Sequence, residues 1–139
     1  MGPFAETVAK TSRLAGQKIL VPGNHDRVHP VYRGSEAKKA EWADMYEAAG
    51  WTIAPLQIEL ELRDGTMIDL CHFPRTGDSH GEDRYVEQRP APSDRWLIHG
   101  HVHEAWKINA AQREINVGVD VQGFCPVSLA EVAEMIKTA

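Results

Sequence analysis

The sequence has 139 residues, enough for one modest domain, and its 42% apolar and 25% charged residues are typical of a folded globular chain. It contains no apolar run of about 18 residues, so no membrane-spanning helix is expected, and its first residues do not resemble a signal peptide. The net charge is −5, which disfavours nonspecific nucleic-acid binding. We therefore expect a cytoplasmic protein with a single domain over residues 1–139 and no membrane partner.

The predicted elements are helices and short strands that follow one another along the whole chain. Their limits come from apolar periodicity and from Gly, Pro and Asx residues at the ends. In chain order they are a helix over 4–15, a strand over 18–21, a helix over 35–49, a strand beginning at 52–53, strands over 57–62 and 67–71, a strand over 96–98, strands over 105–108 and 114–119, and a helix over 128–136. This pattern predicts an α/β (α+β layered) domain whose polar loops gather at one edge of a sheet.

Two cysteines, Cys71 and Cys125, occur far apart in the sequence. Isolated cysteines without an export signal are expected to be buried thiols of a reduced compartment. Cys71 precedes His72 in a predicted strand, and adjacent strand residues face opposite sides. If His72 faces a site, Cys71 faces away from it and belongs to the core.

Three short apolar strands are each followed by side chains that can bind metal ions. The segments are Gly23-Asn24-His25-Asp26, His72-Phe73-Pro74 and Gly100-His101-Val102-His103. Imidazole and amide oxygen suit Zn, Mn, Fe or Ni, and rigid strand ends hold ligands in place. In an extended segment His101 and His103 would point to the same side. One such histidine alone is more often a packed or surface residue, but three segments together indicate a site.

The order and spacing of these three segments resemble the calcineurin-like metallophosphoesterase superfamily. The stretches 116–121 and 126–129 are similar to a small bacterial and phage branch of it. The resemblance extends from about residue 18 to 135 and implies a metallophosphoesterase-type β-sandwich flanked by helices. It also implies two divalent metal ions (Mn, Fe, Zn or Ni) and hydrolysis of a phosphodiester or a small phosphomonoester. The substrate would be a phosphoester small molecule or a nucleotide.

The resemblance further implies a role for each matching residue. Asn24, His72 and His101 would hold one metal and His103 the other, while His25 would protonate the leaving oxygen. Two ions about 3.5–4 Å apart can clamp phosphate oxygens, and an imidazole titrates near neutral pH.

Two further residues near these segments have alternative interpretations. Arg27 follows Asp26 and is predicted to contact the substrate phosphate, with a purely structural role as the alternative. His99 alternates with His101 and either supports a ligand or is a hydrogen-bonded core histidine.

Two blocks of the family pattern, an Asp-x-His and a Gly-Asp, do not precede the first predicted helix. The resemblance therefore implies an N-terminally truncated form, in which either Met1 is internal to a longer frame or the short form is real. Without those carboxylates two cations should bind weakly, and an uncovered strand edge would favour a homo-oligomer.

A possible substitute lies in the segment Gly77-Asp78-Ser79-His80, although no apolar strand precedes it. The favoured interpretation is a solvated loop, and the alternative is that Asp78 or His80 approaches the metal in a one-metal hydrolase. A further alternative for the whole chain is a catalytically silent metal-binding or regulatory relative of the same fold.

Overall fold

The structure is a computed structural model that describes residues 2–139. The chain divides into two compact units, one ending at Leu56 and the other spanning Gln57–Ala139, and each is described by itself. Both contain helices and strands, which confirms the general α/β class. Across residues 2–139 no helix is both long enough and apolar enough to cross a membrane.

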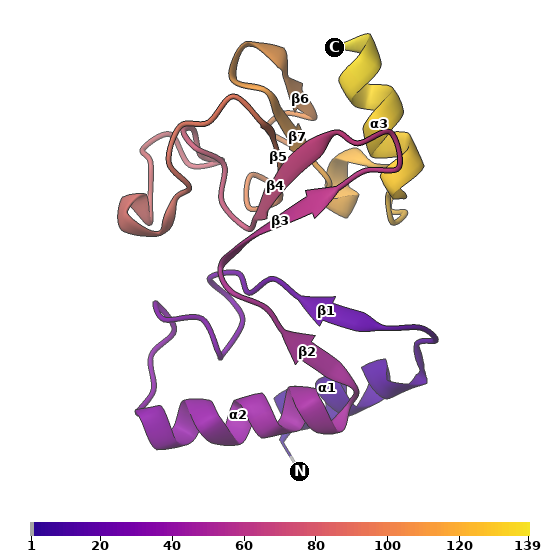
Figure 1. Cartoon of the computed structure of the whole chain (residues 1–139). Helices are drawn as coiled ribbons and strands as arrows, with labels where there is room; N and C mark the ends of the chain where they lie inside the picture. The colour runs from indigo at the N-terminus through magenta and orange to yellow at the C-terminus, as the bar shows by residue number, and fades with distance from the viewer. Residues whose placement is uncertain (1) are drawn as a thin grey trace. The chain divides into compact units, whose positions relative to one another are not determined.

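The first unit combines two helices with a pair of parallel strands (Figure 1). Helix α1 spans Pro3–Lys10 and helix α2 spans Glu36–Ala48, while β1 (Lys18–Leu20) pairs with β2 (Trp51–Ile53). Ser35 begins α2 because its side chain accepts a backbone N–H of the first turn. The unit has its own small core, formed by Val8, Tyr46 and Ala49 with Phe4, Leu20, Val28, Met45, Trp51 and Ile53.

The second unit is built on a five-stranded mixed sheet with strand order β3-β4-β5-β7-β6. The strands are β3 (Gln57–Glu61), β4 (Met67–Cys71), β5 (Trp96–His99), β6 (Ile108–Asn109) and β7 (Glu114–Asn116). The central strands β4, β5 and β7 are parallel, and β3 and β6 pair antiparallel at the two edges. Helix α3 (Leu129–Thr138) closes the chain, with a capping box at Ser128.

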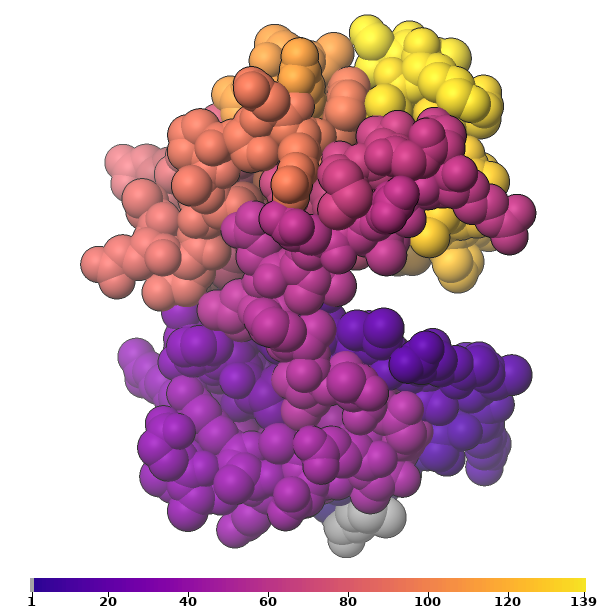
Figure 2. Space-filling view, in the orientation of Figure 1, coloured from indigo at the N-terminus to yellow at the C-terminus, as the bar shows by residue number. Residues whose placement is uncertain are grey.

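One face of this sheet is apolar and is covered by α3. Ile68, Ile98 and Ile115 project from the central strands and pack with Leu62 and Val132. In the space-filling view the yellow atoms of α3 adjoin the magenta hairpin of β3 and β4 (Figure 2). This contact buries the apolar positions of the alternating pattern that the sequence predicted.

The opposite face is covered by the long loop between β4 and β5, residues 72–95. Cys71 and Leu97 of the sheet pack there with Phe73, and Tyr85 of the loop packs against them. The backbone N–H of Arg75 donates to Oε1 of Glu114, 2.7 Å away, so the loop is also tied to β7 by a buried carboxylate.

Several element limits differ from the sequence prediction. The helix predicted over 4–15 ends at Lys10 and continues as a 3-10 turn, Thr11–Arg13. The strand predicted over 105–108 is reduced to β6, because residues 101–105 form tight turns. The strand predicted over 114–119 stops at Asn116, whose Oδ1 accepts the N–H of Gly118 at 2.8 Å and starts a turn.

The two cysteines also differ from each other. Cys71 is buried in the core, as predicted, and burial raises the pKa of its thiol. Cys125 is exposed, so the prediction that both thiols are buried is wrong for this residue. It lies between a 3-10 turn and α3, in a segment without strand or helix of its own to cover it.

Candidate functional site

His72 and His101 lie together at the carboxyl ends of two adjacent parallel strands. His72 directly follows β4 and His101 comes two residues after the end of β5, and their ring centroids are 5.3 Å apart. Gly100 joins the two segments, because its N–H donates to the carbonyl of His72 at 3.1 Å. The parallel pairing of β4 with β5 thus brings two of the predicted ligands to one edge of the sheet.

The segment from His101 to His103 is not extended. Both histidines have positive φ, 68° and 49°, and the N–H of Val102 donates to the carbonyl of Gly100 at 2.8 Å. The strand alternation that would place the two rings on the same side therefore does not apply to this segment, because left-handed residues break it. His103 is exposed, and its Nδ1 lies 3.4 Å from Oδ2 of Asp120.

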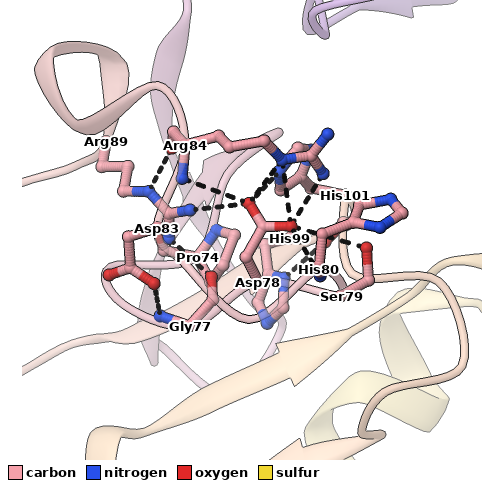
Figure 3. A network of polar contacts seen from close by, with 11 residues as sticks. Pro74, Gly77, Asp78, Ser79, His80, Asp83, Arg84, Arg89, His99 and His101 are labelled. Carbon is pink, nitrogen blue, oxygen red and sulfur yellow. Dashed lines mark hydrogen bonds and ion pairs between the residues drawn. The ribbon is translucent and has the colours of Figure 1, made fainter.

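The side chain of Asp78 is fully buried, although the favoured prediction for its segment was a solvated loop. Its Oδ2 lies 3.0 Å from Nε2 of His101. Arg84 Nη2 donates to its Oδ1 at 2.7 Å, and Arg89 Nη2 donates to its Oδ2 at 3.3 Å (Figure 3). His80 is exposed and contributes its backbone N–H to Oδ1 at 3.3 Å. Asp78 thus contacts one predicted ligand, His101, and the alternative that Asp78 or His80 approaches a metal stays a prediction.

The charges in this cluster are set by opposing effects. Burial disfavours ionisation of Asp78, but hydrogen bonds from Arg84 and His101 outweigh it and hold the pKa of this carboxyl well below its usual range. For His101, burial is the largest effect and lowers the pKa, and together with the charges of Arg84 and Arg89 it outweighs the Asp78 carboxylate, which raises the pKa. The ring is then neutral at neutral pH, and because an ionised carboxylate only accepts hydrogen bonds, Nε2 carries the ring hydrogen.

Two aromatic rings, those of Phe73 and Tyr85 in the loop of residues 72–95, contact the His101 imidazole. Phe73 lies edge-on at 4.8 Å between centroids and Tyr85 at 5.8 Å. Phe73 also contacts the ring of His72, at 4.9 Å. Ring contacts of this kind restrict the positions that the two imidazoles can adopt.

The loop after β1 carries the other predicted site residues, Asn24, His25 and Arg27, within the first unit. Asn24 is buried and the side chain of His25 is exposed. Asp26 fixes this loop, because its Oδ2 accepts the N–H of Gly23 at 2.8 Å and its Oδ1 accepts the hydroxyl of Tyr46 at 2.9 Å. Burial and the Asp26 carboxylate raise the pKa of Tyr46, so the phenol remains a donor.

Arg27 lies against two aromatic rings of the first unit. Its guanidinium carbon is 4.1 Å from the ring centre of Phe4 and 5.2 Å from that of Trp42. A guanidinium held by its face on aromatic rings keeps its N–H groups at the edge for an anion. Its predicted phosphate contact stays a prediction.

His99 and Asn116 make hydrogen bonds to the backbone of the segment that carries His101 and His103. His99 is buried, its Nδ1 bonds the carbonyl of Gly100 at 2.8 Å, and burial lowers its pKa to about 4. The core interpretation of His99 is thereby confirmed. Asn116 Nδ2 donates to the carbonyls of His103 at 2.7 Å and Trp106 at 2.9 Å, which fixes the loop that bears His103.

The sequence reasoning missed the anchoring role of Asn116 and the burial of Asp78. The strand-ending pattern Asn116-Val117-Gly118 is one signal for an Asx turn, and Arg84 and Arg89 near Asp78 are cations that could pair with it. Neither signal specifies the distant partners that the fold supplies.

The donors at this edge fit a divalent transition metal in their chemistry, since they include two imidazoles and a carboxylate that contacts one of them. In the described chain, residues 2–139, no group of three or more His, Cys, Asp or Glu side chains is arranged to hold a metal ion. Amide oxygens such as that of Asn24 are a further ligand type in the predicted set.

Comparisons with known proteins identify two phage relatives. The chain is 33% identical over 124 residues to Gene 66 protein of Mycobacterium phage D29, an alignment that covers 88% of this chain and 61% of that protein. It is 33% identical over 126 residues to Gene 66 protein of Mycobacterium phage L5, with 88% and 60% covered. The chain thus spans about three fifths of the length of these relatives. No family model and no solved structure matches it.

Proposed function

We propose that the chain is a metal-dependent phosphoesterase, or part of one, built on a metallophosphoesterase-type sandwich. The observation that carries the proposal is the contact between His72 and His101 at the carboxyl ends of adjacent parallel strands. Sheet edges of this kind hold ligands in many α/β proteins, and imidazoles following rigid strands suit a metal. The substrate is a phosphodiester or a small phosphomonoester, including nucleotides.

The proposed roles follow the sequence pattern. Asn24, His72 and His101 hold one divalent ion and His103 the other, and the ions are Mn, Fe, Zn or Ni. Such ions supply Lewis-acid stabilisation of the phosphoryl charge and a nucleophilic water. His25 donates a proton to the leaving oxygen, and the Asp26 contacts with Gly23 and Tyr46 support this role because they hold its loop still.

The test is hydrolysis of bis(p-nitrophenyl) phosphate with added Mn²⁺. We expect turnover by the wild-type chain and a rate at least about 100-fold lower in His72→Ala, since removing a ligand weakens metal binding. His80→Ala is the matched control, because His80 is exposed and only its backbone contacts Asp78. Equal turnover of wild type and His72→Ala, or no turnover by folded wild type, would contradict the proposal.

A second candidate is a catalytically silent metal-binding or regulatory relative. The observation in favour of its catalytic silence is that, among residues 2–139, no third His, Cys, Asp or Glu side chain joins His72 and His101 in a group that could hold the ion a two-metal reaction needs. Zinc binding that depends on His72 in a chain without turnover would identify this candidate. Sedimentation of the same samples tests the proposed homo-oligomer.

A further inference from the structure

We propose that the second unit carries a binding pocket for the oxyanion group, a carboxylate or a phosphate, of a small organic molecule. The pocket lies beside the amino ends of β5 and β7, where residues 92–94 and 111–113 lead into these strands. His72 and His101 follow the carboxyl ends of β4 and β5. The pocket therefore uses none of the residues on which the proposed function depends.

The pocket is large enough for a small molecule and is lined mainly by polar residues. Its volume is about 490 Å³, which is within the range of ligand sites in proteins. The beginning of the loop of residues 72–95, the end of that loop and the turn before β7 form its wall. The residues that line it include Arg75, Ser93, Asp94, Ala111, Gln112 and Arg113.

Arg113 is the cation with the most donors left for a ligand. Within residues 2–139 its guanidinium makes one hydrogen bond, from Nη1 to the backbone carbonyl of Asp94, and no ion pair. A guanidinium has five N–H donors in a planar fork that matches the oxygens of a carboxylate or a phosphate. The bond to Asp94 holds the side chain at the pocket, because both residues line it.

The backbone at Arg113 is also unusual. It is in the left-handed region, with a φ of 54°. Glycine or asparagine adopts this conformation at a lower cost in free energy than arginine does. Strained residues other than glycine are concentrated at functional sites, so the conformation supports a use for the guanidinium at this position.

Arg75 gives the pocket a rigid and positively charged wall. Its side chain is 7% exposed, and its Nη1 and Nη2 donate to the carbonyls of Gln112 and Arg95, each at 3.0 Å. Among residues 2–139 its Nε is buried without a hydrogen-bond partner. The carboxylate of Asp69 lies 4.0 Å from Nη2 and is shared with Arg95, so the charge of Arg75 is only partly compensated.

The amide of Gln112 adds a neutral donor to the same wall. Its Oε1 accepts the hydroxyl of Thr76 at 2.8 Å, which fixes the orientation of the amide. Nε2 of this amide can then donate to an anion beside Arg113.

Asp94 provides a test of the sign of the ligand charge. It lines the pocket, but it binds Arg113 through its backbone carbonyl and not through its carboxylate. Asp94→Asn therefore keeps this contact and removes a negative charge that opposes an anion. The same change would weaken the binding of a cation.

The experiment titrates the chain with phenyl phosphate, benzoate and benzyl alcohol, at low ionic strength and in the presence of EDTA. Backbone ¹H–¹⁵N shifts locate the binding and give its dissociation constant. We expect phenyl phosphate or benzoate to shift the amides of residues 75–76, 93–94 and 111–113, and benzyl alcohol to bind much more weakly because it carries no charge. The tighter of the two anions identifies the group as a phosphate or a carboxylate.

Three variants test whether the binding depends on the pocket. Arg113→Gln should weaken the binding of the tighter anion by about 10-fold or more, since hydrogen bonds to charged groups are lost. Asp94→Asn should strengthen it by about 2–5-fold. Arg63→Gln is the matched control, because it removes the same charge from an exposed position outside the pocket, and its affinity should stay near that of wild type.

The other outcomes contradict the proposal. A folded wild-type chain that binds neither anion, or binds benzyl alcohol as tightly, overturns it even if Arg113→Gln fails to fold. Equal weakening in Arg113→Gln and Arg63→Gln would mean that the anions respond to net charge and not to the pocket. Weaker anion binding by Asp94→Asn would also overturn it. Turnover of bis(p-nitrophenyl) phosphate is unaffected by these results and tests the proposed function separately.

Discussion

The two faces of the five-stranded sheet are both buried, but their covers differ in chemistry. Helix α3 covers one face with aliphatic side chains, and Ile68 and Ile115 there are 0% exposed. The loop of residues 72–95 covers the other face, where Glu114 is also 0% exposed but is a carboxylic acid. The same sheet therefore has one face that stabilises the fold and one that holds polar groups in place.

The polar face is the less completely satisfied of the two. Four buried side-chain atoms among residues 2–139 have no hydrogen-bond partner, and they belong to residues of this side or of the loops beside it: Arg75 Nε, His99 Nε2, Trp106 Nε1 and Glu114 Oε2. Unsatisfied buried groups reduce stability, and proteins tolerate them mainly near functional sites. The comparison thus favours function at the loop-covered face and its edge.

The largest expected effect is on the apolar face. Ile115→Ala should lower the free energy of unfolding by about 2–5 kcal/mol, because it opens a cavity among packed aliphatic groups. Ile108 pairs with Ile115 across β6 and β7 but is partly exposed. Ile108→Ala should therefore lower the free energy of unfolding by less than about 1 kcal/mol. Urea unfolding of both variants is the measurement, and similar losses would mean that the α3 face is loosely packed.

A smaller effect is expected where the loop meets the sheet edge. Gly77 and Gly81 both have positive φ. A Cβ added to Gly77 would lie 2.7 Å from the Trp106 side chain, whereas a Cβ added to Gly81 would have no heavy atom within 4 Å beyond its chain neighbours. Gly81→Ala therefore measures backbone strain alone, and Gly77→Ala adds a clash with a ring.

We expect Gly77→Ala to lower the free energy of unfolding, measured with urea, by about 1–3 kcal/mol more than Gly81→Ala does. Because Gly77 adjoins Asp78, the long-range ¹H–¹⁵N signals of His101 should also shift in this variant. Equal losses for the two variants would show that the loop adapts to the added methyl group and does not hold the cluster rigidly.

The sequence was sufficient to predict the elements of the apolar face but not the side-chain contacts of the loop-covered face. Periodicity placed α2, α3 and the β3–β4 hairpin closely, since their apolar spacing reflects local geometry. It extended the strand over 105–108 too far, because Asn116 holds that segment in turns from a distance. Strand ends correctly brought His72 and His101 together, whereas the burial of Asp78 depends on Arg84 and Arg89, whose contacts no local pattern encodes.

The smallest expected effect concerns Glu114 and depends on pH. Burial raises the pKa of this carboxyl, against the opposing influence of Arg75. The folded state then holds its proton to higher pH than the unfolded state does, so wild type loses stability as pH rises from about 4.3, the ordinary value for glutamate, through the raised pKa.

Glu114→Gln cannot ionise, and its amide oxygen can still accept the N–H of Arg75. Its stability relative to wild type should therefore improve with rising pH across that interval and then stay constant, as measured by urea unfolding at a series of pH values. Glu61→Gln, which removes the same charge from an exposed position on β3, controls for net charge. If the stability of Glu114→Gln relative to wild type falls with rising pH, the arginines stabilise the ionised Glu114 carboxylate. The charges on the loop-covered face would then be compensated, contrary to the comparison of the two faces.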